Sequence, residues 1–567
     1  MQQPTVLVFK PSFKKETDRK AQLATIQASK ALSEIVRTTL GPRSMLKMLL
    51  DPMGGIVITN DGNSILREID VANPAAKSLI ELSRSLDEEV GDGTTSCVVL
   101  CGQVLSNCTN LLKKEIHPTE IVKGLMDALE DSIKALEQIA IEVDLSDHDK
   151  LLQVVESCLG TKLSSRWGNL TSKLALESVL KLYYNSQKYS TSATNAADGT
   201  NGAAPASSGY LDVKRLIKIE KVPGGLLEDS KVLDGVLINK DVTHAGMSRR
   251  VANPRVLILD CTLEYKKGES QTMVDITSEE AWNELLLQEE SEIRQMCQHV
   301  IDSGCNVVVT EKGVSDLAQH YLVKAGISCI RRVRKSDANR IAKCTGATIV
   351  NRPEEITKQD VGHSCGLFYV DKIGDEYYSY FVDCEKTKSC SIVLRGGSKD
   401  VLNEVERNMY DALNVCRNIL SNCKLLPGGG ATEIYVSNYL NKQIQLKSGL
   451  KRLSYESACK AFEIIPKTLA QNCGANPVRV ISDLLSLHAA GSHSMGIDGE
   501  TGEIVDVVKK NLFDTFAVKE QVYKSAIESV RACMLLRIDI IVSGIGQKEL
   551  GADEKVAINE DALQEQA

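Results

Sequence analysis

The stretch that decides the fold reads Gly-Asp-Gly-Thr-Thr at residues 91–95 and continues into an apolar stripe. Backbone N–H groups at a helix start bind anions, and glycines let the backbone approach a phosphate closely. The stripe recurs at steps of three and four positions, which is the spacing of one helix face: Val98, Cys101, Leu105, Cys108 and Leu112. The pattern therefore indicates either a phosphate-binding turn or an ordinary helix start capped by Asp and Thr.

A carboxylate inside this turn suggests a metal ion beside the phosphate. Asp92 lies between the two glycines, and Mg²⁺ is usually bound through one or two carboxylates together with phosphate oxygens. The chain has no Gly-Lys dipeptide for a Walker A loop and no H-E-x-x-H zinc motif. The G-x-S-x-G motif of serine hydrolases is also absent.

Three further segments have the composition of loops that could approach a nucleotide. Leu40-Gly41-Pro42 ends one helical pattern, and Gly428-Gly429-Gly430 precedes another. Each could line a phosphate, or could be only a helix stop or a plain turn. Gly499-Glu500-Thr501-Gly502 is typical of a hairpin, and Asp506 after it could also meet a ribose hydroxyl pair.

Two other carboxylates are candidates for positioning a water molecule. Asp61 follows a short β-rich run at residues 56–59, and Asp411 lies in a helical pattern over residues 401–420. A well-placed carboxylate can orient and deprotonate an attacking water. The plainer interpretation is a turn residue and a solvated helix residue.

The composition is that of a soluble globular chain with a large core. The 567 residues correspond to roughly four domains, and 43% hydrophobic with 25% charged residues argues against disorder. A net charge of −8 and the lack of a long uncharged apolar run argue against a nucleic-acid or membrane binder. The 17 cysteines have no C-x-x-C spacing and no secretory signal is visible, so we expect reduced thiols and a cytoplasmic location.

Along the chain the patterns are helical, then mixed, then helical. Strand-like runs at residues 256–259 and 307–310 are separated by a charged helical pattern at residues 279–300, which predicts an α/β module. The flanking helical ends could be two domains or one discontinuous domain. Residues 185–208 are poor in large apolar side chains and predict a flexible surface insertion, and residues 551–567 predict a polar tail.

Together these segments resemble the group II chaperonins. Four motifs occur in that family's order, and the resemblance covers almost the whole chain: Leu40-Gly41-Pro42, Thr59-Asn60-Asp61-Gly62, residues 91–95 and Pro427-Gly428-Gly429-Gly430. Other stretches resemble one subunit type of the eukaryotic cytosolic chaperonin, TRiC or CCT; they are residues 48–55, 263–272, 316–321 and 330–335. The resemblance implies a multidomain chaperonin fold with α and α/β parts.

The resemblance also implies a domain order. The family has a discontinuous, mainly helical equatorial domain, a hinge-like intermediate domain, and an α/β apical domain that binds clients and carries a helical lid protrusion. In this sequence they would be equatorial residues 1–144 and 403–567, intermediate residues 145–215 and 373–402, and apical residues 216–372 with the lid within 241–288.

When the family's site for ATP or ADP is mapped onto the matching positions of this sequence, each of the motifs above contributes residues to it. Asp92 would hold Mg²⁺, and Asp61 and Asp411 would orient and deprotonate the attacking water. Lys162 would sense the terminal phosphate, although a solvated surface lysine remains the plainer interpretation. The nucleotide-binding set would be Leu40, Gly41, Pro42, Gly93, Thr94, Thr95, Ser96, Lys162, Gly428, Gly429, Gly430 and Asp506.

By resemblance, the chain is an ATPase that drives protein folding. ATP binding and hydrolysis would close the lid over unfolded cytosolic clients of the actin and tubulin class, in a double ring of eight subunits per ring. The chain departs from the family's pattern in the length of residues 185–208. It also departs within residues 536–540, where an isoleucine replaces a usual aspartate.

Two other interpretations stay open at the level of sequence. The chain could be a ring subunit that presents clients as a structural scaffold with little ATP turnover of its own. It could also be a small-molecule kinase that uses glycine-rich loops on a different fold. The mass of the native complex distinguishes a ring subunit from a kinase.

Overall fold

The computed structural model describes residues 14–50, 54–71, 73–145, 147–162, 169–194, 212–265, 278–385, 387–528 and 536–543. The chain forms two compact units: the first comprises Met1–Ile141 and Leu426–Ala567, and the second comprises Glu142–Leu425. The two helical ends of the chain therefore belong to one discontinuous unit, and the middle of the chain forms the other.

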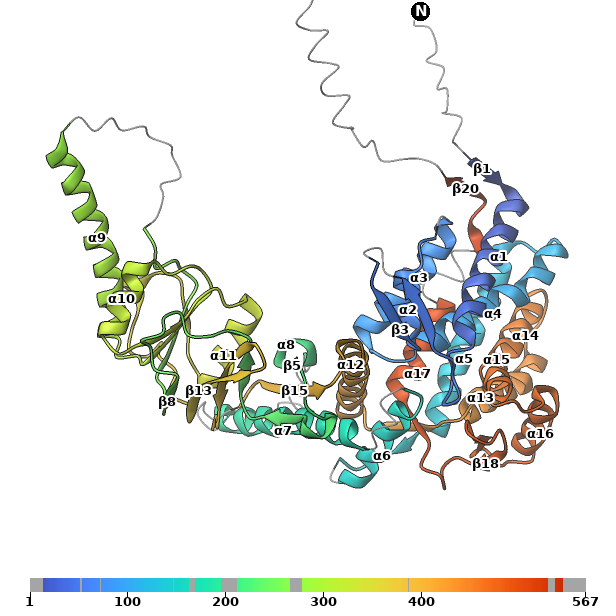
Figure 1. Cartoon of the computed structure of the whole chain (residues 1–567). Helices are drawn as coiled ribbons and strands as arrows, with labels where there is room; N and C mark the ends of the chain where they lie inside the picture. Colours follow the sequence, from blue (N-terminus) through green and yellow to red (C-terminus); the bar gives the residue numbers. More distant parts are fainter. Residues whose placement is uncertain are drawn as a thin grey trace, which may run out of the picture. The chain divides into compact units, whose positions relative to one another are not determined.

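The first unit is a helical bundle built around α4 (Thr94–Lys113). The apolar stripe predicted for this helix is buried, and α1 (Asp18–Arg37) lies beside it (Figure 1). Gly102 permits this close packing, because a Cβ there would lie 2.6 Å from the Cβ of Ser33. The other helices of the unit are α2 (Gly62–Glu68), α3 (Pro74–Glu89), α5 (Pro118–Ile139), α13 (Ala431–Gln443), α14 (Lys451–Phe462), α15 (Ile464–Asn472), α16 (Pro477–Ala489) and α17 (Phe516–Tyr523).

The strands of the first unit form short antiparallel ribbons. The pairs are β1 (Lys14–Thr17) with β20 (Ile540–Ser543), β2 (Lys47–Leu50) with β3 (Ile56–Thr59), and β17 (Met495–Ile497) with β18 (Ile504–Asp506). β16 (Lys424–Pro427) is a neighbour of β19 (Phe513–Thr515), and β4 (Ile141–Glu142) lies where the chain passes between the units. These ribbons connect the helices and carry most of the loops considered below.

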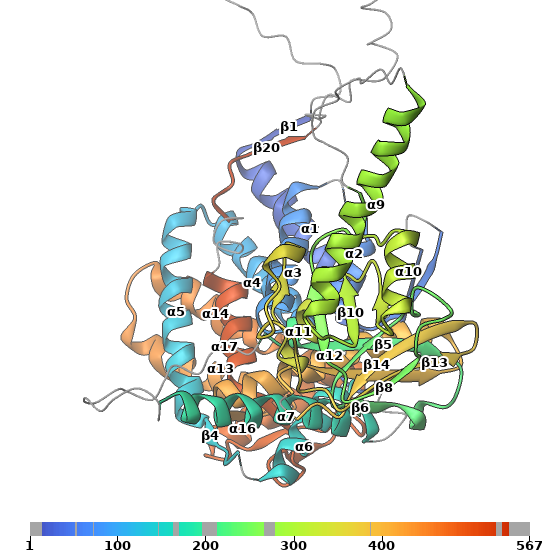
Figure 2. The same ribbon diagram turned by 90° about the vertical axis from the view of Figure 1, so that its left-hand side faces the viewer.

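The second unit contains two main hydrophobic cores. The larger surrounds a parallel sheet in the order β11-β10-β9-β12, beside an antiparallel sheet in the order β7-β14-β13-β8. Figure 2 shows α9, α10 and α11 near β10. The elements are β7 (Val236–Ile238), β8 (Arg250–Ala252), β9 (Val256–Leu259), α9 (Glu279–Asp302), β10 (Val307–Thr310), α10 (Asp316–Lys324), β11 (Ser328–Ile330), α11 (Lys335–Thr345), β12 (Ile349–Val350), β13 (Leu367–Ile373) and β14 (Glu376–Val382).

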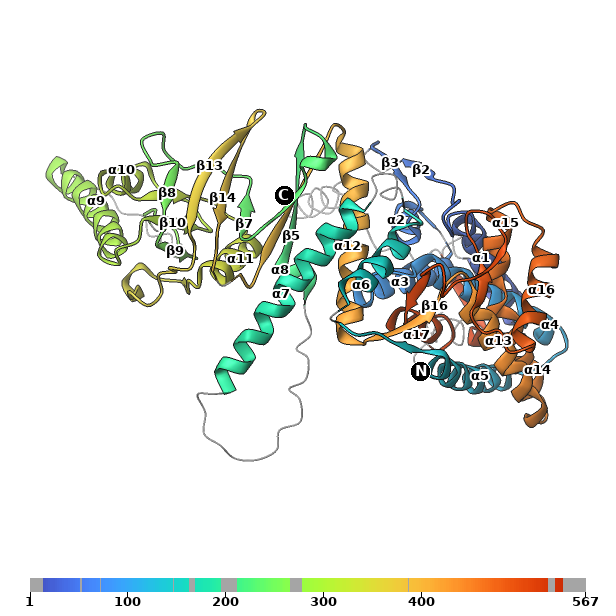
Figure 3. The ribbon, with the colours of Figure 1, turned by 90° about the horizontal axis from the view of Figure 1, so that it is seen from below.

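The smaller core of the second unit lies between helices and a three-stranded sheet in the order β5-β15-β6. Figure 3 shows α7 and α12 next to β5 and β15. The elements are α6 (His148–Leu159), α7 (Leu170–Thr194), α8 (Val213–Leu216), β5 (Ile217–Pro223), β6 (Lys231–Leu233), β15 (Cys390–Gly396) and α12 (Lys399–Ser421). Here β5 runs parallel to β15, and β6 runs antiparallel to it.

The structure places two boundaries differently from the sequence interpretation. The predicted start of the C-terminal helical part, residue 403, falls inside α12, which lies wholly in the second unit because Leu402, Val405 and Met409 pack in the smaller core. The predicted boundary at residues 372–373 falls within the β13–β14 hairpin. The finer division into apical and intermediate domains stays a prediction.

The first part of the predicted flexible insertion is helical. α7 continues to Thr194, and near its start in the insertion Asn185 Nδ2 donates to the carbonyl of Thr387 at 2.9 Å. The remainder of the insertion, residues 266–277 of the predicted lid and the tail at 551–567 lie outside the described residues. The predicted helices and strands at residues 279–300, 256–259, 307–310 and 401–420 are confirmed.

Among the helices that the structure describes, none combines the length and apolarity needed to cross a membrane. The described cysteines are free thiols, and most are buried. Burial raises the pKa of Cys459 to about 11 and that of Cys416 to about 12. These side chains therefore pack as neutral thiols at physiological pH.

Candidate functional site

The turn at residues 91–95 starts α4 at a glycine. Gly93 is the N-cap residue, with a φ of +77°, and it forms no side-chain cap. A Cβ at this position would lie 2.8 Å from Val522 Cγ2 and 3.0 Å from Val518 Cγ1, so the site requires glycine. The N-terminal N–H groups of a helix with no side-chain cap suit an external anion, which favours the phosphate-binding interpretation of this turn.

The Asp61 turn packs directly against this helix start. Asp61 caps α2: its Oδ2 accepts hydrogen bonds from Ser64 N at 3.0 Å and from Ser64 Oγ at 2.8 Å. Thr94 Oγ1 donates to Asp61 Oδ1 at 3.4 Å, and a Cβ on Gly62 would lie 2.5 Å from Thr95 Oγ1. The structure thus brings together two predicted segments whose contacting residues, Asp61 and Thr94, are 33 positions apart in the chain.

Asp92 has the surroundings expected of a metal ligand beside bound phosphate. Its Oδ1 accepts a hydrogen bond from Gly93 N at 2.7 Å, and the residue is half-buried at the start of α4. Within the described residues, no group of three or more His, Cys, Asp or Glu side chains could hold a metal. A single carboxylate next to an anion site fits Mg²⁺, which usually takes its other ligands from phosphate and water.

Helix α15 links the Gly41 loop to the triple-glycine loop. Gly41 has a φ of +91° and its Cβ would lie 2.8 Å from Leu469 Cδ2, while Asn472 Nδ2 donates to the carbonyl of Leu40 at 2.8 Å. Gly430 begins α13 with a φ of +78°, again without a side-chain cap, and its Cβ would lie 2.8 Å from Pro466 Cβ. Sequence patterns gave no sign that α15 would support both loops.

The β17–β18 hairpin joins the same assembly. Ile497 N donates to the carbonyl of Gly429 at 2.8 Å, and a Cβ on Gly499 would lie 2.4 Å from Pro42 Cγ. The hairpin expected at residues 499–502 is therefore present, and it packs on the Gly41–Pro42 loop. Gly428 closes the other side, because its N–H donates to the carbonyl of Leu512 at 2.9 Å.

Two aspartates shape this hairpin. Asp506 ends β18, and although partial burial opposes its ionisation, hydrogen bonds from Ser494 and Lys509 hold the pKa of Asp506 below its ordinary value. Asp498, which the sequence interpretation missed, accepts from Lys510 Nζ at 2.7 Å and from Thr501 Oγ1 at 3.0 Å. Its position directly after a strand, before a Gly-x-x-Gly turn, is the signal that could have identified it.

The remaining candidates, Asp411 and Lys162, form an ion pair in the second unit. Lys162 Nζ lies 2.8 Å from Asp411 Oδ2, and only 11% and 13% of the two side chains are exposed. Lys162 follows α6, and Asp411 lies on the buried face of α12. The plainer interpretations, a solvated lysine and a solvated helix aspartate, are therefore both wrong.

Comparison with known proteins gives a consistent result. Residues 32–545 match the TCP-1/cpn60 chaperonin family. The chain is similar to T-complex protein 1 subunit gamma of Oxytricha granulifera, with 52% identity over 550 residues that cover 96% of this chain and 95% of the relative. It is 48% identical to the human protein of that name over 550 residues (97% of each chain), and 49% identical to that of Schizosaccharomyces pombe over 545 residues (96% and 99%).

Proposed function

This chain belongs to the TCP-1/cpn60 chaperonin family and acts in protein folding, and from that premise we propose that it binds and hydrolyses Mg·ATP. One observation carries the proposal. The uncapped start of α4 packs against the Asp61 turn, in the same unit as the three other loops that the family resemblance assigns to the nucleotide.

The proposed roles follow from the chemistry of each group. N–H groups of Thr94, Thr95 and Ser96 bind phosphate oxygens at the positive end of the α4 dipole. Asp92 holds the metal, which neutralises phosphate charge when it is bound. Asp61 is kept oriented by the two hydrogen bonds from Ser64, so its remaining lone pairs are aimed rather than free to rotate.

The ion pair of Lys162 and Asp411 suggests how nucleotide binding is coupled to the second unit. A terminal phosphate competes with Asp411 for the Lys162 ammonium, because both are anions and the lysine can satisfy either. Once Lys162 turns to the phosphate, Asp411 is released to accept a proton from the attacking water. Hydrolysis removes the terminal phosphate, and the ion pair forms again.

Assembly and clients are part of the same proposal. The β2–β3 ribbon presents four apolar side chains to solvent, with exposed fractions of 42–73%: Met48, Leu50, Ile56 and Ile58. A two-stranded ribbon with such a face is rarely stable alone and suits pairing with a neighbouring subunit. We propose a cytosolic hetero-oligomer with two rings of eight subunits, which encloses clients of the actin and tubulin class. Trp282 and Leu287 on α9, exposed by 54% and 65%, suit binding of unfolded chains.

The test varies this subunit alone in the reconstituted complex. Asp411→Asn is expected to slow hydrolysis at this subunit's site by on the order of a hundredfold, while labelling of the subunit by azido-ATP stays unchanged. Asp92→Asn should instead weaken the labelling. Asp400→Asn, at an exposed position of the same helix α12, is the matched control.

The scaffold alternative makes a different prediction for the same complexes. If this subunit contributes little turnover, Asp61→Ala and Asp411→Asn both leave the total ATPase rate unchanged. Normal hydrolysis by the Asp411→Asn subunit itself, measured in a complex where the other subunits are inactive, would contradict the proposed role of Asp411.

A further inference from the structure

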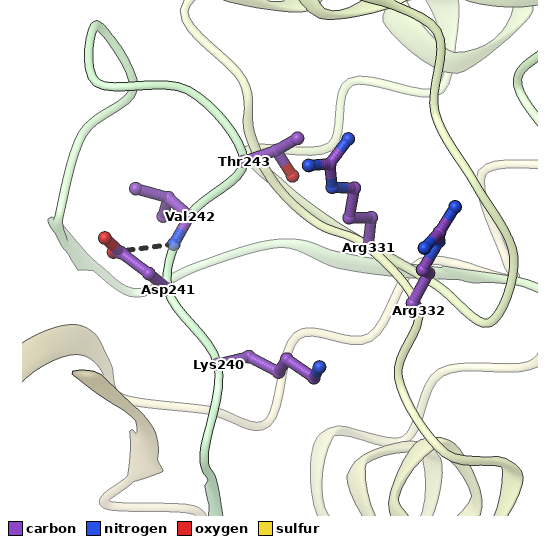
Figure 4. A pocket seen from close by; sticks show the side chains of 6 residues that line it. All are labelled: Lys240, Asp241, Val242, Thr243, Arg331 and Arg332. Carbon is purple, nitrogen blue, oxygen red and sulfur yellow. Dashed lines mark hydrogen bonds between the residues drawn. The ribbon is translucent and has the colours of Figure 1, made fainter. Parts of the chain in front are cut away.

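A basic pocket in the second unit has no part in the proposed ATP site. The pocket encloses about 350 Å³ and lies between the segment after β7 and the loop after β11 (Figure 4). Arg331 and Arg332 extend from consecutive positions of one wall, and Lys240 lies on the other. The remaining lining residues are Asp241, Val242 and Thr243.

Within the part of the chain that the structure describes, three positive charges of this pocket have no ion-pair partner. Lys240, Arg331 and Arg332 are exposed, and none forms an ion pair with another residue that the structure describes. The single acid, Asp241, is already neutralised, because Arg249 Nη2 lies 2.8 Å from its Oδ2 and Val242 N donates to its Oδ1 at 2.7 Å. Mutual repulsion of three unpaired cations is relieved when an anion binds among them.

The walls of the pocket are fixed to one another rather than loose. Thr243 donates from both its N–H and its Oγ1 to the carbonyl of Cys329, each at 2.8 Å, which ties the two walls together. Arg332 has a left-handed backbone with a φ of +53°, held by a hydrogen bond from its N–H to the carbonyl of Lys312 at 3.1 Å. Such strain persists where the surroundings impose it and is frequent at binding sites.

The lining determines the class of ligand. Guanidinium groups bind phosphate through two parallel hydrogen bonds, and an ammonium adds a third contact. The described residues that line the pocket include no aromatic side chain, and the one apolar residue among them, Val242, is buried, so they offer no platform for a nucleobase. A pocket of this volume is at the small end of ligand sites.

We propose that Lys240, Arg331 and Arg332 form a binding site for a compact cluster of phosphate groups. The phosphates could belong to a free oligophosphate or to neighbouring phosphorylated side chains of a bound polypeptide, since the pocket recognises the same chemistry in both. None of its residues belongs to the proposed nucleotide site.

The test uses the full-length chain with saturating Mg·ADP, so that the nucleotide site is filled. Anisotropy of a fluorescein-labelled peptide with two adjacent phosphoserines measures binding, and unlabelled tripolyphosphate is the competitor. Arg331→Gln combined with Arg332→Gln should weaken binding of both anions at least about tenfold, because each loses charge-assisted hydrogen bonds. The matched control is Arg334→Gln, which removes an exposed arginine of the same loop that does not line the pocket.

The outcomes separate the two sources. Binding of both the phosphopeptide and tripolyphosphate shows that the site accepts phosphate groups from either source. If direct calorimetry detects binding of tripolyphosphate but the phosphopeptide does not bind, the natural ligand is a free oligophosphate. Equal binding of the unphosphorylated peptide, or unchanged affinity of both probes for the double variant, overturns the proposal. Failure of the ATP proposal would show itself differently, as loss of ADP binding by the wild-type chain.

Discussion

Replacing Lys519 with methionine should destabilise the part of the first unit that supports two glycine loops. Lys519, on α17, is buried and bonds to Glu433 in the first turn of α13, and its Nζ lies 3.1 Å from Asp514 Oδ2. Burial alone would lower the pKa of Lys519, but the carboxylates of Asp514 and Glu433 outweigh it and raise that pKa above its ordinary value. These two neighbours therefore keep the buried lysine in its charged form.

The magnitude follows from what the substitution leaves behind. The Glu433 side chain is 0% exposed, and its Oε2 has no hydrogen-bond partner among the described residues, so Lys519 provides its main compensation. Removing one partner of a buried ion pair costs about 3–5 kcal/mol, whereas replacing both with uncharged groups of similar size is often near neutral. Lys519→Met should cost that amount, and Lys519→Met with Glu433→Gln should recover most of it.

Hydrogen exchange of the full-length chain, read by mass spectrometry on peptides from α13 and α17, measures the local loss of stability. The opening free energy of both helices should fall in the single variant and return in the double variant. The control is Lys460→Met on α14, which removes a lysine that is 64% exposed and forms an ion pair with Glu456. This variant should change the opening free energy by less than about 1 kcal/mol. The reasoning would be refuted if Lys519→Met lowered the opening free energy no more than Lys460→Met does. It would also be refuted if the double variant lowered the opening free energy more than Lys519→Met alone.

Three other variants, two with a single substitution and one with a pair, test separate features of the first unit. Gly93→Ala should weaken ATP binding severalfold in calorimetry, because its Cβ meets Val522 at 2.8 Å, whereas Gly449→Ala, also at positive φ but with nothing within 4 Å, should leave it unchanged. Burial alone would raise the pKa of Asp498, but the hydrogen bond from Lys510 contributes most to holding that pKa below its ordinary value. The carboxylate therefore stabilises the folded hairpin at any pH above the ordinary aspartate pKa. This stabilisation is lost as the pH falls through the pKa that Asp498 has in the folded chain. Asp498→Asn should therefore reduce the hydrogen-exchange protection of the β17–β18 hairpin at neutral pH. It should also make that protection depend less on pH in the acid range. Met48→Lys with Leu50→Lys should leave folding unchanged but reduce co-purification with partner subunits, since both side chains are at least 70% exposed; undiminished co-purification would exclude this ribbon from the interface.

Local patterns in the sequence were sufficient to predict most elements. The charged helical pattern predicted at residues 279–300 is present as α9, Glu279–Asp302, where the side chain of Ser278, a good N-cap residue, accepts from Ala281 N. The stripe of α4 is buried because its spacing matches the helical period. Such features depend on neighbours a few residues away, and the sequence displays those neighbours directly.

Contacts over long sequence separations could not be predicted in this way. The ion pair of Lys162 and Asp411 joins residues 249 positions apart, and nothing in either local pattern distinguishes it from two solvated charges. The end of α7 was misjudged for a similar reason: low apolar content at residues 185–194 suggested a loop, but the helix continues from a packed segment, with Asn185 anchored to Thr387. Tertiary partners override weak local preference in both cases.

The contacts among the loops explain why motifs that are weak alone become decisive together. Glycines in three of the family's motifs leave room for a residue from another part of the chain, which a side chain at the same position would collide with: Gly62 with Thr95, Gly41 with Leu469, and Gly430 with Pro466. A substitution in one loop therefore displaces the support of another, so we expect double substitutions across loops to be non-additive in ATP affinity. A chain that used these glycines only as separate turns would tolerate them independently, because open turns such as Gly449 have no such neighbours. The requirement for glycine at several distant positions at once is thus a property of one assembled surface, and this is the physical reason that their order and spacing identify the family.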